Sequence, residues 1–246
     1  MPTRAPEETD ILCENCGYML NGLPPSGNCP ECGTPIDVSV SDRFRQPPLW
    51  EAIGDSRPKT VRFLLTSLQI ILAPTRFFRG STSRGQVQSA YIFAQIQWAL
   101  SALLLGFAAL FHYKSEWYCH YYMYKPIIWL TPVLLVSLPL IAYLATLFTI
   151  RIAARLTAWE SNYRGYRLPH GVVLRALYYH SAHLLPVGIV AFATCGLYCY
   201  LLGNPLDRAA SEPIYLYILS GEVIVAAAYL FYTYWIGMRN WMFANR

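Results

Sequence analysis

Charged side chains are scarce in this chain. Asp, Glu, Lys and Arg make up 13% of its 246 residues, whereas soluble proteins average about 25%. Hydrophobic residues reach 55% and gather in four long runs after residue 88. This composition excludes an ordinary soluble protein, because four runs without a polar face would leave too little surface for water to solvate.

Catalytic motifs are also missing. Glu222 is the only acidic residue in the four runs, and none of the runs contains an aspartate. An intramembrane protease would need paired aspartates or a serine–histidine dyad. The sequence shows no nucleophile motif, phosphate-binding loop or carboxylate cluster for two metal ions. We therefore predict that the protein is not an enzyme.

The four apolar runs have the length of membrane spans. A helix needs about 20 apolar residues to cross about 30 Å of hydrocarbon. Because the first ten residues are polar, we expect the first run to act as its own insertion signal. The sequence predicts an all-α integral membrane helical bundle of about four spans within residues 88–240, at 90–111, 127–150, 176–202 and 214–236.

Basic residues alternate between the two sides of these runs. Of the 19 Lys and Arg residues, sixteen lie before the first run, between the second and third, or after the fourth. The other three lie in the remaining two connections. The positive-inside rule then places both termini in the cytoplasm. We expect a multi-pass protein, in a bacterial cell membrane, whose aromatic-rich first connection meets the outer headgroups.

The segments before the first span have a different character. Residues 37–60 are polar and contain Pro47, Pro48, Gly54 and Pro58, which predicts a flexible linker. Residues 61–73 are apolar but too short to cross a membrane, so 61–79 is predicted to be an amphipathic interfacial segment. A remnant of a fifth span is the alternative. The apolar face of this segment contains Val61, Leu64, Leu65, Leu68, Ile71 and Leu72, opposite Arg62, Thr66 and Gln69.

Two matched cysteine pairs occur within residues 1–36. Each Cys-x-x-Cys is followed by glycine and the pairs are twelve residues apart, which is the spacing of a four-cysteine zinc ribbon. The competing interpretations are a redox dithiol and rubredoxin-type iron. A redox motif normally occurs once, beside a βαβ pattern. We predict one structural Zn²⁺ ion, bound by Cys13, Cys16, Cys29 and Cys32.

The charge of the ribbon argues against nucleic acid as a partner. Residues 1–40 have a net charge of −5, whereas residues 41–90 have a net charge of +5. Phosphate binding requires Lys and Arg, of which residues 1–40 contain one, Arg4. A basic stretch beside a membrane is attracted to anionic lipid. We expect membrane lipid and an unidentified soluble protein as partners.

Three segments carry a family resemblance. The ribbon CGYMLNGLPPSGNCPECGTPI resembles the N-terminal ribbon of bacterial membrane proteins of unknown function. LAPTRFF (72–78) and RALYYHSAHLLPVGIV (175–190) resemble the Yip-type family of multispan membrane proteins. Eukaryotic members of that family are associated with Rab GTPases and vesicle traffic, and its pattern contains no catalytic residues. Members usually have five spans, whereas four are counted here.

Two functions fit these features. The first is a non-enzymatic membrane scaffold or adaptor whose zinc ribbon is a cytoplasmic protein-docking head. The second is a small transporter or channel-like protein that uses Glu222, because a carboxylate within the bilayer marks a candidate functional site. His180 and His183 share one face of the third span. A protonated Glu222, hydrogen-bonded across a helix interface beside Gly221, is the structural alternative.

Overall fold

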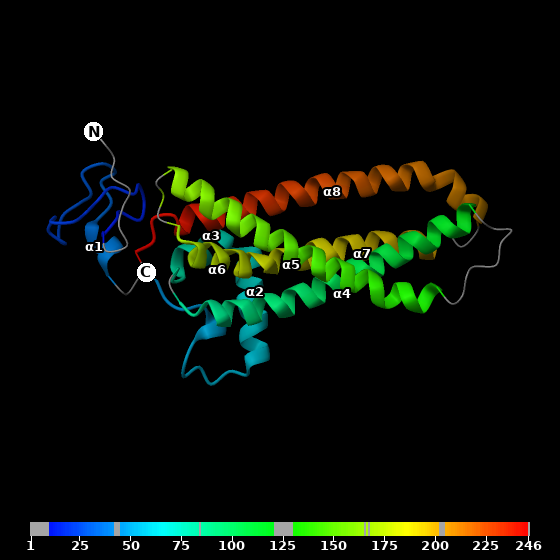
Figure 1. The fold of residues 1–246 in the computed structure, drawn as a ribbon, viewed down its shortest axis with the longest axis horizontal. Coiled ribbons are helices and arrows are strands. Elements are labelled where there is room, and N and C mark those ends of the chain that lie inside the picture. The colour runs from blue at the N-terminus through cyan, green and yellow to red at the C-terminus, as the bar shows by residue number, and fades with distance from the viewer. Residues whose placement is uncertain are drawn as a thin grey trace. The chain divides into compact units, whose positions relative to one another are not determined.

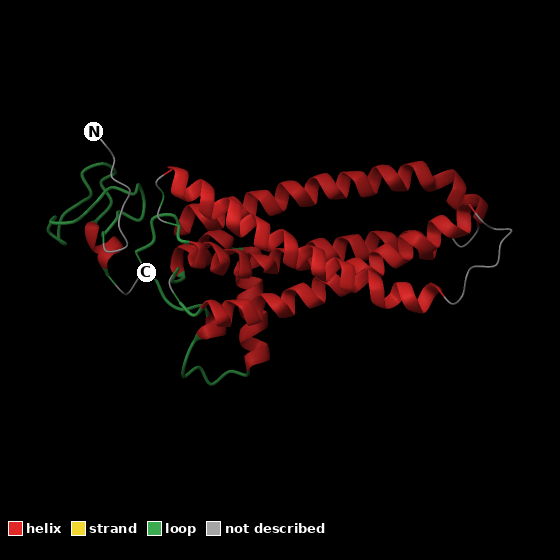
Figure 2. Cartoon of the chain, viewed as in Figure 1, coloured by secondary structure: helices red, strands yellow, loops and turns green. Residues whose placement is uncertain are grey.

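Most of the described residues of the chain are helical (Figures 1 and 2). The computed structural model describes residues 10–41, 45–83, 85–120, 130–164, 166, 168–201 and 205–245. Within these ranges there are isolated β-bridges but no strands. The helices are α1 Ile36–Val40, α2 Lys59–Leu72, α3 Pro74–Gly80, α4 Val87–His120, α5 Leu130–Arg164, α6 His170–His180, α7 Leu184–Leu201 and α8 Pro205–Trp241, with 3₁₀ turns η1 Leu49–Glu51 and η2 Ser181–His183.

Four helical segments are long and apolar enough to cross a membrane, as predicted. They cover Val87–Lys114, Leu130–Arg164, His170–Tyr200 and Pro213–Trp241. The predicted all-α membrane fold is therefore confirmed. The third segment differs from a single continuous helix, because the 3₁₀ turn η2 separates α6 from α7. The expected aromatic-rich outer connection falls largely on residues 121–129, outside the described part of the chain.

Helices α2 and α3 form a bent apolar pair before the first span. Their axes differ by 115°, and Pro74 begins the second helix. The apolar face predicted for α2 is exposed at Leu64, Leu68 and Leu72, as expected of a helix lying at the membrane interface. Thr66 differs from the prediction of a solvent-facing polar face, because it is fully buried and accepts a hydrogen bond from the Trp50 backbone N–H.

The chain packs into two compact units, whose boundaries fall within helices. The first contains residues 1–94, 150–182 and 232–246, and the second contains residues 95–149 and 183–231. In the first unit, a row of aromatic rings packs in tilted and edge-to-face contacts. These rings belong to Trp50, Phe63, Phe93, Tyr179 and Phe77, with centroids 5.1–6.1 Å apart.

The segment expected to be a flexible linker makes specific contacts in the first unit. Glu51 accepts hydrogen bonds from both terminal nitrogens of the fully buried Arg175, at 2.6 and 2.7 Å, and from the Tyr179 hydroxyl at 2.5 Å. Trp50 donates through its indole N–H to the Ser89 carbonyl. At Trp50 and Glu51 the segment therefore differs from the flexible linker that the sequence predicts. Ion pairing and ring packing hold it against α2, α4 and α6.

The second unit is built on close contacts between spans. A Cβ atom added at Gly106 would lie 2.5 Å from the ring of Pro139, so α4 and α5 approach closely there. A Cβ at Gly188 would lie 3.2 Å from Leu104, which brings α7 against α4. Small residues at helix interfaces are the usual means of packing helices within a bilayer.

Candidate functional site

The two cysteine turns of the ribbon have matching backbone geometry. In the first, the Cys13 N–H donates to Tyr18 O and the Gly17 N–H donates to Cys13 O, both at 2.8 Å. The second repeats the pattern, with Cys29 N–H bonded to Thr34 O and Gly33 N–H to Cys29 O. Gly17 and Gly33 have φ values of 79° and 71°, a left-handed conformation that glycine adopts without steric cost.

These turns bring the four predicted ligands together. The Cys13, Cys16, Cys29 and Cys32 sulfur atoms all lie within 4.8 Å of one another, with Cys13–Cys32 at 3.5 Å and Cys16–Cys29 at 3.6 Å. A tetrahedral ion with metal–sulfur bonds of about 2.3 Å requires sulfur–sulfur distances of about 3.8 Å. The cluster therefore fits one metal ion, and four thiolates would leave no open position for a substrate.

The thiols differ in their readiness to ionise. The pKa of Cys32 is lowered to about 5, because the hydroxyl and backbone N–H of Thr34 stabilise its thiolate. Burial raises the pKa of Cys13, whose side chain lies in the small ribbon core with Leu20, Cys29 and Ile36. Metal binding must therefore displace protons from the cluster.

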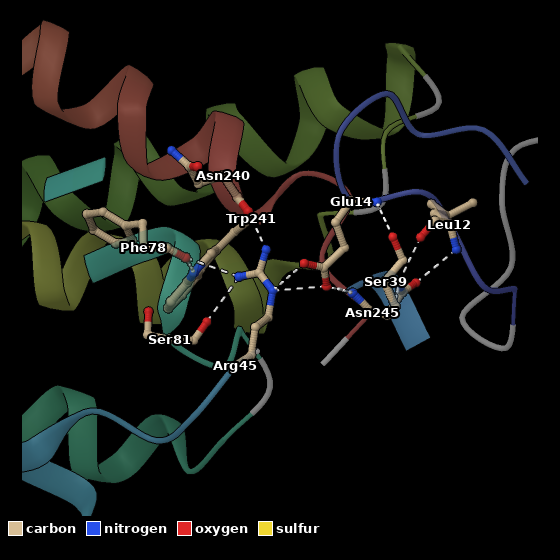
Figure 3. Close-up of polar contacts among 9 residues, drawn as sticks. All are labelled: Leu12, Glu14, Ser39, Arg45, Phe78, Ser81, Asn240, Trp241 and Asn245. Carbon is tan, nitrogen blue, oxygen red and sulfur yellow. Dashed lines mark hydrogen bonds and ion pairs between the residues drawn. The ribbon is translucent and has the colours of Figure 1, made fainter. Parts of the chain in front are cut away.

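A buried arginine fastens the ribbon to the membrane helices (Figure 3). Arg45 Nε lies 2.8 Å from Glu14 Oε2, and the side chains of the pair are 5% and 16% exposed. The same guanidinium donates to the carbonyls of Phe78 and Ser81 on and after α3, both at 3.0 Å, and to Asn240 O on α8 at 2.9 Å. One side chain thus joins three segments of the first unit.

The C-terminal tail is bound to the ribbon by a second set of contacts. Asn245 accepts a hydrogen bond from the Leu12 N–H at 2.9 Å and donates to Leu12 O at 2.7 Å and to Ser39 O at 2.9 Å. A Cβ atom added at Gly17 would lie 2.5 Å from the Phe243 ring. Sequence reasoning missed these contacts, since a single Asn in a tail carries no local pattern.

The intramembrane polar residues have partners of their own. Glu222 on α8 accepts a hydrogen bond from the Thr194 hydroxyl on α7. His183 Nδ1 lies 2.7 Å from the Tyr229 hydroxyl, and His180 Nε2 lies 2.9 Å from the Thr233 hydroxyl. The bond to Thr194 agrees with the alternative in which Glu222 is hydrogen-bonded across a helix interface. Gly221 does not provide the close packing expected there, because a Cβ atom added to it would meet no described atom within 4 Å.

An apolar cavity of about 410 Å³ lies beside this carboxylate in the second unit. Its walls come from α4, α7 and α8, and Glu222 and Tyr229 are the polar residues among them. The structure therefore places Glu222 and the partner of His183 around one cavity.

Comparisons with known proteins give no match, whether to a family model, to a curated protein or to a solved structure.

Proposed function

We propose that this protein is a non-enzymatic membrane adaptor whose zinc-loaded ribbon docks a soluble partner. The observation that carries the proposal is the closed four-cysteine cluster, which has the ligands and spacing of a structural zinc site. A metal held by four thiolates stabilises the ribbon fold and takes no part in a reaction. The resemblance to the Yip-type family, whose pattern has no catalytic residues, supports the same conclusion.

The ribbon offers a surface for such a partner. Ile11, Tyr18 and Met19 are between 36% and 40% exposed. Met19 is bridged to Leu12, and Ile11 and Tyr18 are the neighbours of these two residues in the sequence. Exposed apolar groups on a small metal-supported module favour protein recognition. The acidic character of residues 1–40 favours a partner with a basic surface.

The test is crosslinking of the full chain in native membranes, followed by identification of the captured protein. The double substitution Tyr18→Ser with Met19→Ser should abolish capture while the metal content stays at one ion per chain. Ile53→Ser is the matched control, because Ile53 is a fully exposed apolar residue outside the ribbon. Equal capture by the double variant and the control would contradict the docking proposal.

A transporter or channel-like function is the second candidate, favoured by the cavity beside Glu222. A carboxylate at the wall of an apolar cavity can bind a cation or a proton in transit. In proteoliposomes, Glu222→Gln should then abolish flux, while Glu160→Gln, at an exposed position outside this cavity, should not. Equal flux of protons and common cations in wild type, Glu222→Gln and empty liposomes would remove this candidate.

A further inference from the structure

A second, polar cavity lies in the first unit, where the ribbon meets the helices. Its volume is about 720 Å³, within the range of small-ligand sites. Glu14, Cys16 and Arg45 line it from the N-terminal segment. The helical wall contains Arg79 of α3 and Arg239 of α8.

The cavity has two positive charges in excess on its helical side. Glu14 neutralises Arg45 in the ion pair described above. Arg79 and Arg239 are exposed, and neither side chain forms an ion pair or a hydrogen bond with another residue in the described part of the chain. Cys16 adds negative charge at the ribbon wall once its thiolate binds metal. The two arginines therefore favour the binding of an anion on the helical side of the cavity.

Packing between α3 and α8 holds these arginines at one cavity. The Phe78 ring lies 5.4 Å from the Trp241 ring, and its carbonyl accepts the Trp241 indole N–H at 2.8 Å. A Cβ atom at Gly237 would approach this ring to 3.2 Å. Phe78 immediately precedes Arg79, and Arg239 lies between Gly237 and Trp241, so the contact fixes the backbone beside both cations.

The cavity also lies at the level expected for lipid headgroups. Arg239 is near the end of the apolar segment Pro213–Trp241. Trp235 and Tyr232 line the same cavity and are 51% and 64% exposed. Tryptophan and tyrosine are enriched where a membrane meets water, and basic pockets at helix ends bind anionic headgroups.

From these observations we propose that the cavity binds one anionic phospholipid, with its phosphodiester held between Arg79 and Arg239. The acyl chains pass along Trp235 and Tyr232 towards the hydrocarbon. This site is distinct from the ribbon's proposed protein-docking face and does not depend on it.

The test uses the full chain in detergent, stripped of lipid and titrated with dihexanoyl phosphatidylglycerol, with bound molecules counted by native mass spectrometry. We expect one tight site per chain. Replacing both cavity arginines (Arg79→Gln with Arg239→Gln) should weaken it roughly thirtyfold. Replacing both by lysine should retain most of the binding. The matched control is Arg151→Gln with Arg155→Gln, which removes two exposed charges from α5 outside the cavity and should change the affinity less than threefold.

Parallel titrations identify the source of the phosphate. Dihexanoyl phosphatidylcholine and inorganic phosphate should each bind at least tenfold more weakly than the anionic lipid. Inorganic phosphate binding as tightly as the lipid would overturn the lipid assignment. Equal losses in the two glutamine variants, or no loss in the cavity variant, would overturn the site itself.

Discussion

Substitution of Arg45 by Met tests whether the ribbon is fixed to the helices. The change keeps an aliphatic side chain but leaves the Glu14 carboxylate, 16% exposed, without its cation. It also removes the donors to Phe78 O, Ser81 O and Asn240 O. Removing one partner of a buried ion pair costs about 3–5 kcal/mol. The ribbon and the tail should therefore undock or open far more often.

Amide hydrogen exchange of the full chain in detergent measures this opening. Peptides covering residues 10–41 and 238–245 should lose at least a hundredfold in protection, as expected for about 3 kcal/mol. The double variant Arg45→Met with Glu14→Leu should recover part of the loss, since no buried charge is then stranded. Arg57→Met is the control, because Arg57 forms an exposed ion pair with Asp55. Equal exchange in Arg45→Met and Arg57→Met would refute the reasoning.

Three further predictions concern the ribbon and the topology. Purified protein should contain about one zinc ion per chain by elemental analysis, and iron with a rubredoxin-like visible spectrum would contradict the zinc assignment. The affinity for zinc should fall as the pH decreases, because the pKa values of Cys13 and Cys16 are raised in the metal-free cluster and both thiols must lose their protons to bind the metal. Gly17→Ala should lower metal retention on chelator challenge, because Gly17 has a positive φ and an added Cβ would clash with the Phe243 ring. Gly22→Ala is the control, since Gly22 also has a positive φ but an added Cβ would meet no described atom, and it should lower retention less. Equal effects would show that the Phe243 contact is unimportant. A membrane-impermeant maleimide should label Cys119 on intact cells and the ribbon cysteines only after permeabilisation; labelling of the ribbon from outside would reverse the predicted orientation.

The features that sequence reasoning predicted depend on local patterns. Uncharged runs longer than 20 residues are membrane spans regardless of their neighbours. Each cysteine pair has its own turn and its own glycine, so residues adjacent in sequence determine the geometry of each half of the cluster. The two halves are themselves only twelve residues apart, which is short enough for the spacing to predict that they meet.

The features that it missed depend on partners distant in sequence. Arg175 and Glu51 are 124 positions apart, and Arg45 and Asn240 are 195 apart. A polar segment with several prolines is typical of a linker whether or not its charged side chains find a buried partner elsewhere. The helical wheel places Thr66 opposite the apolar face of α2, but a wheel cannot distinguish a polar face in water from one packed on a neighbouring turn.

The contacts of Arg45 and Asn245 bear on how the proposed adaptor would bind a partner. A flexible linker of about 24 residues would let the ribbon range some 25–30 Å, and a partner could be captured anywhere within that reach. The ribbon is instead held through the ion pair of Glu14 with Arg45, which donates hydrogen bonds to α3 and α8. Leu12 of the ribbon also bonds to Asn245 of the C-terminal tail. A fixed head loses little conformational entropy on binding, so each Å² of contact contributes more to affinity than on a tethered head. It also presents Ile11, Tyr18 and Met19 in one orientation, which restricts the partner to an approach set by the ribbon's own attachment.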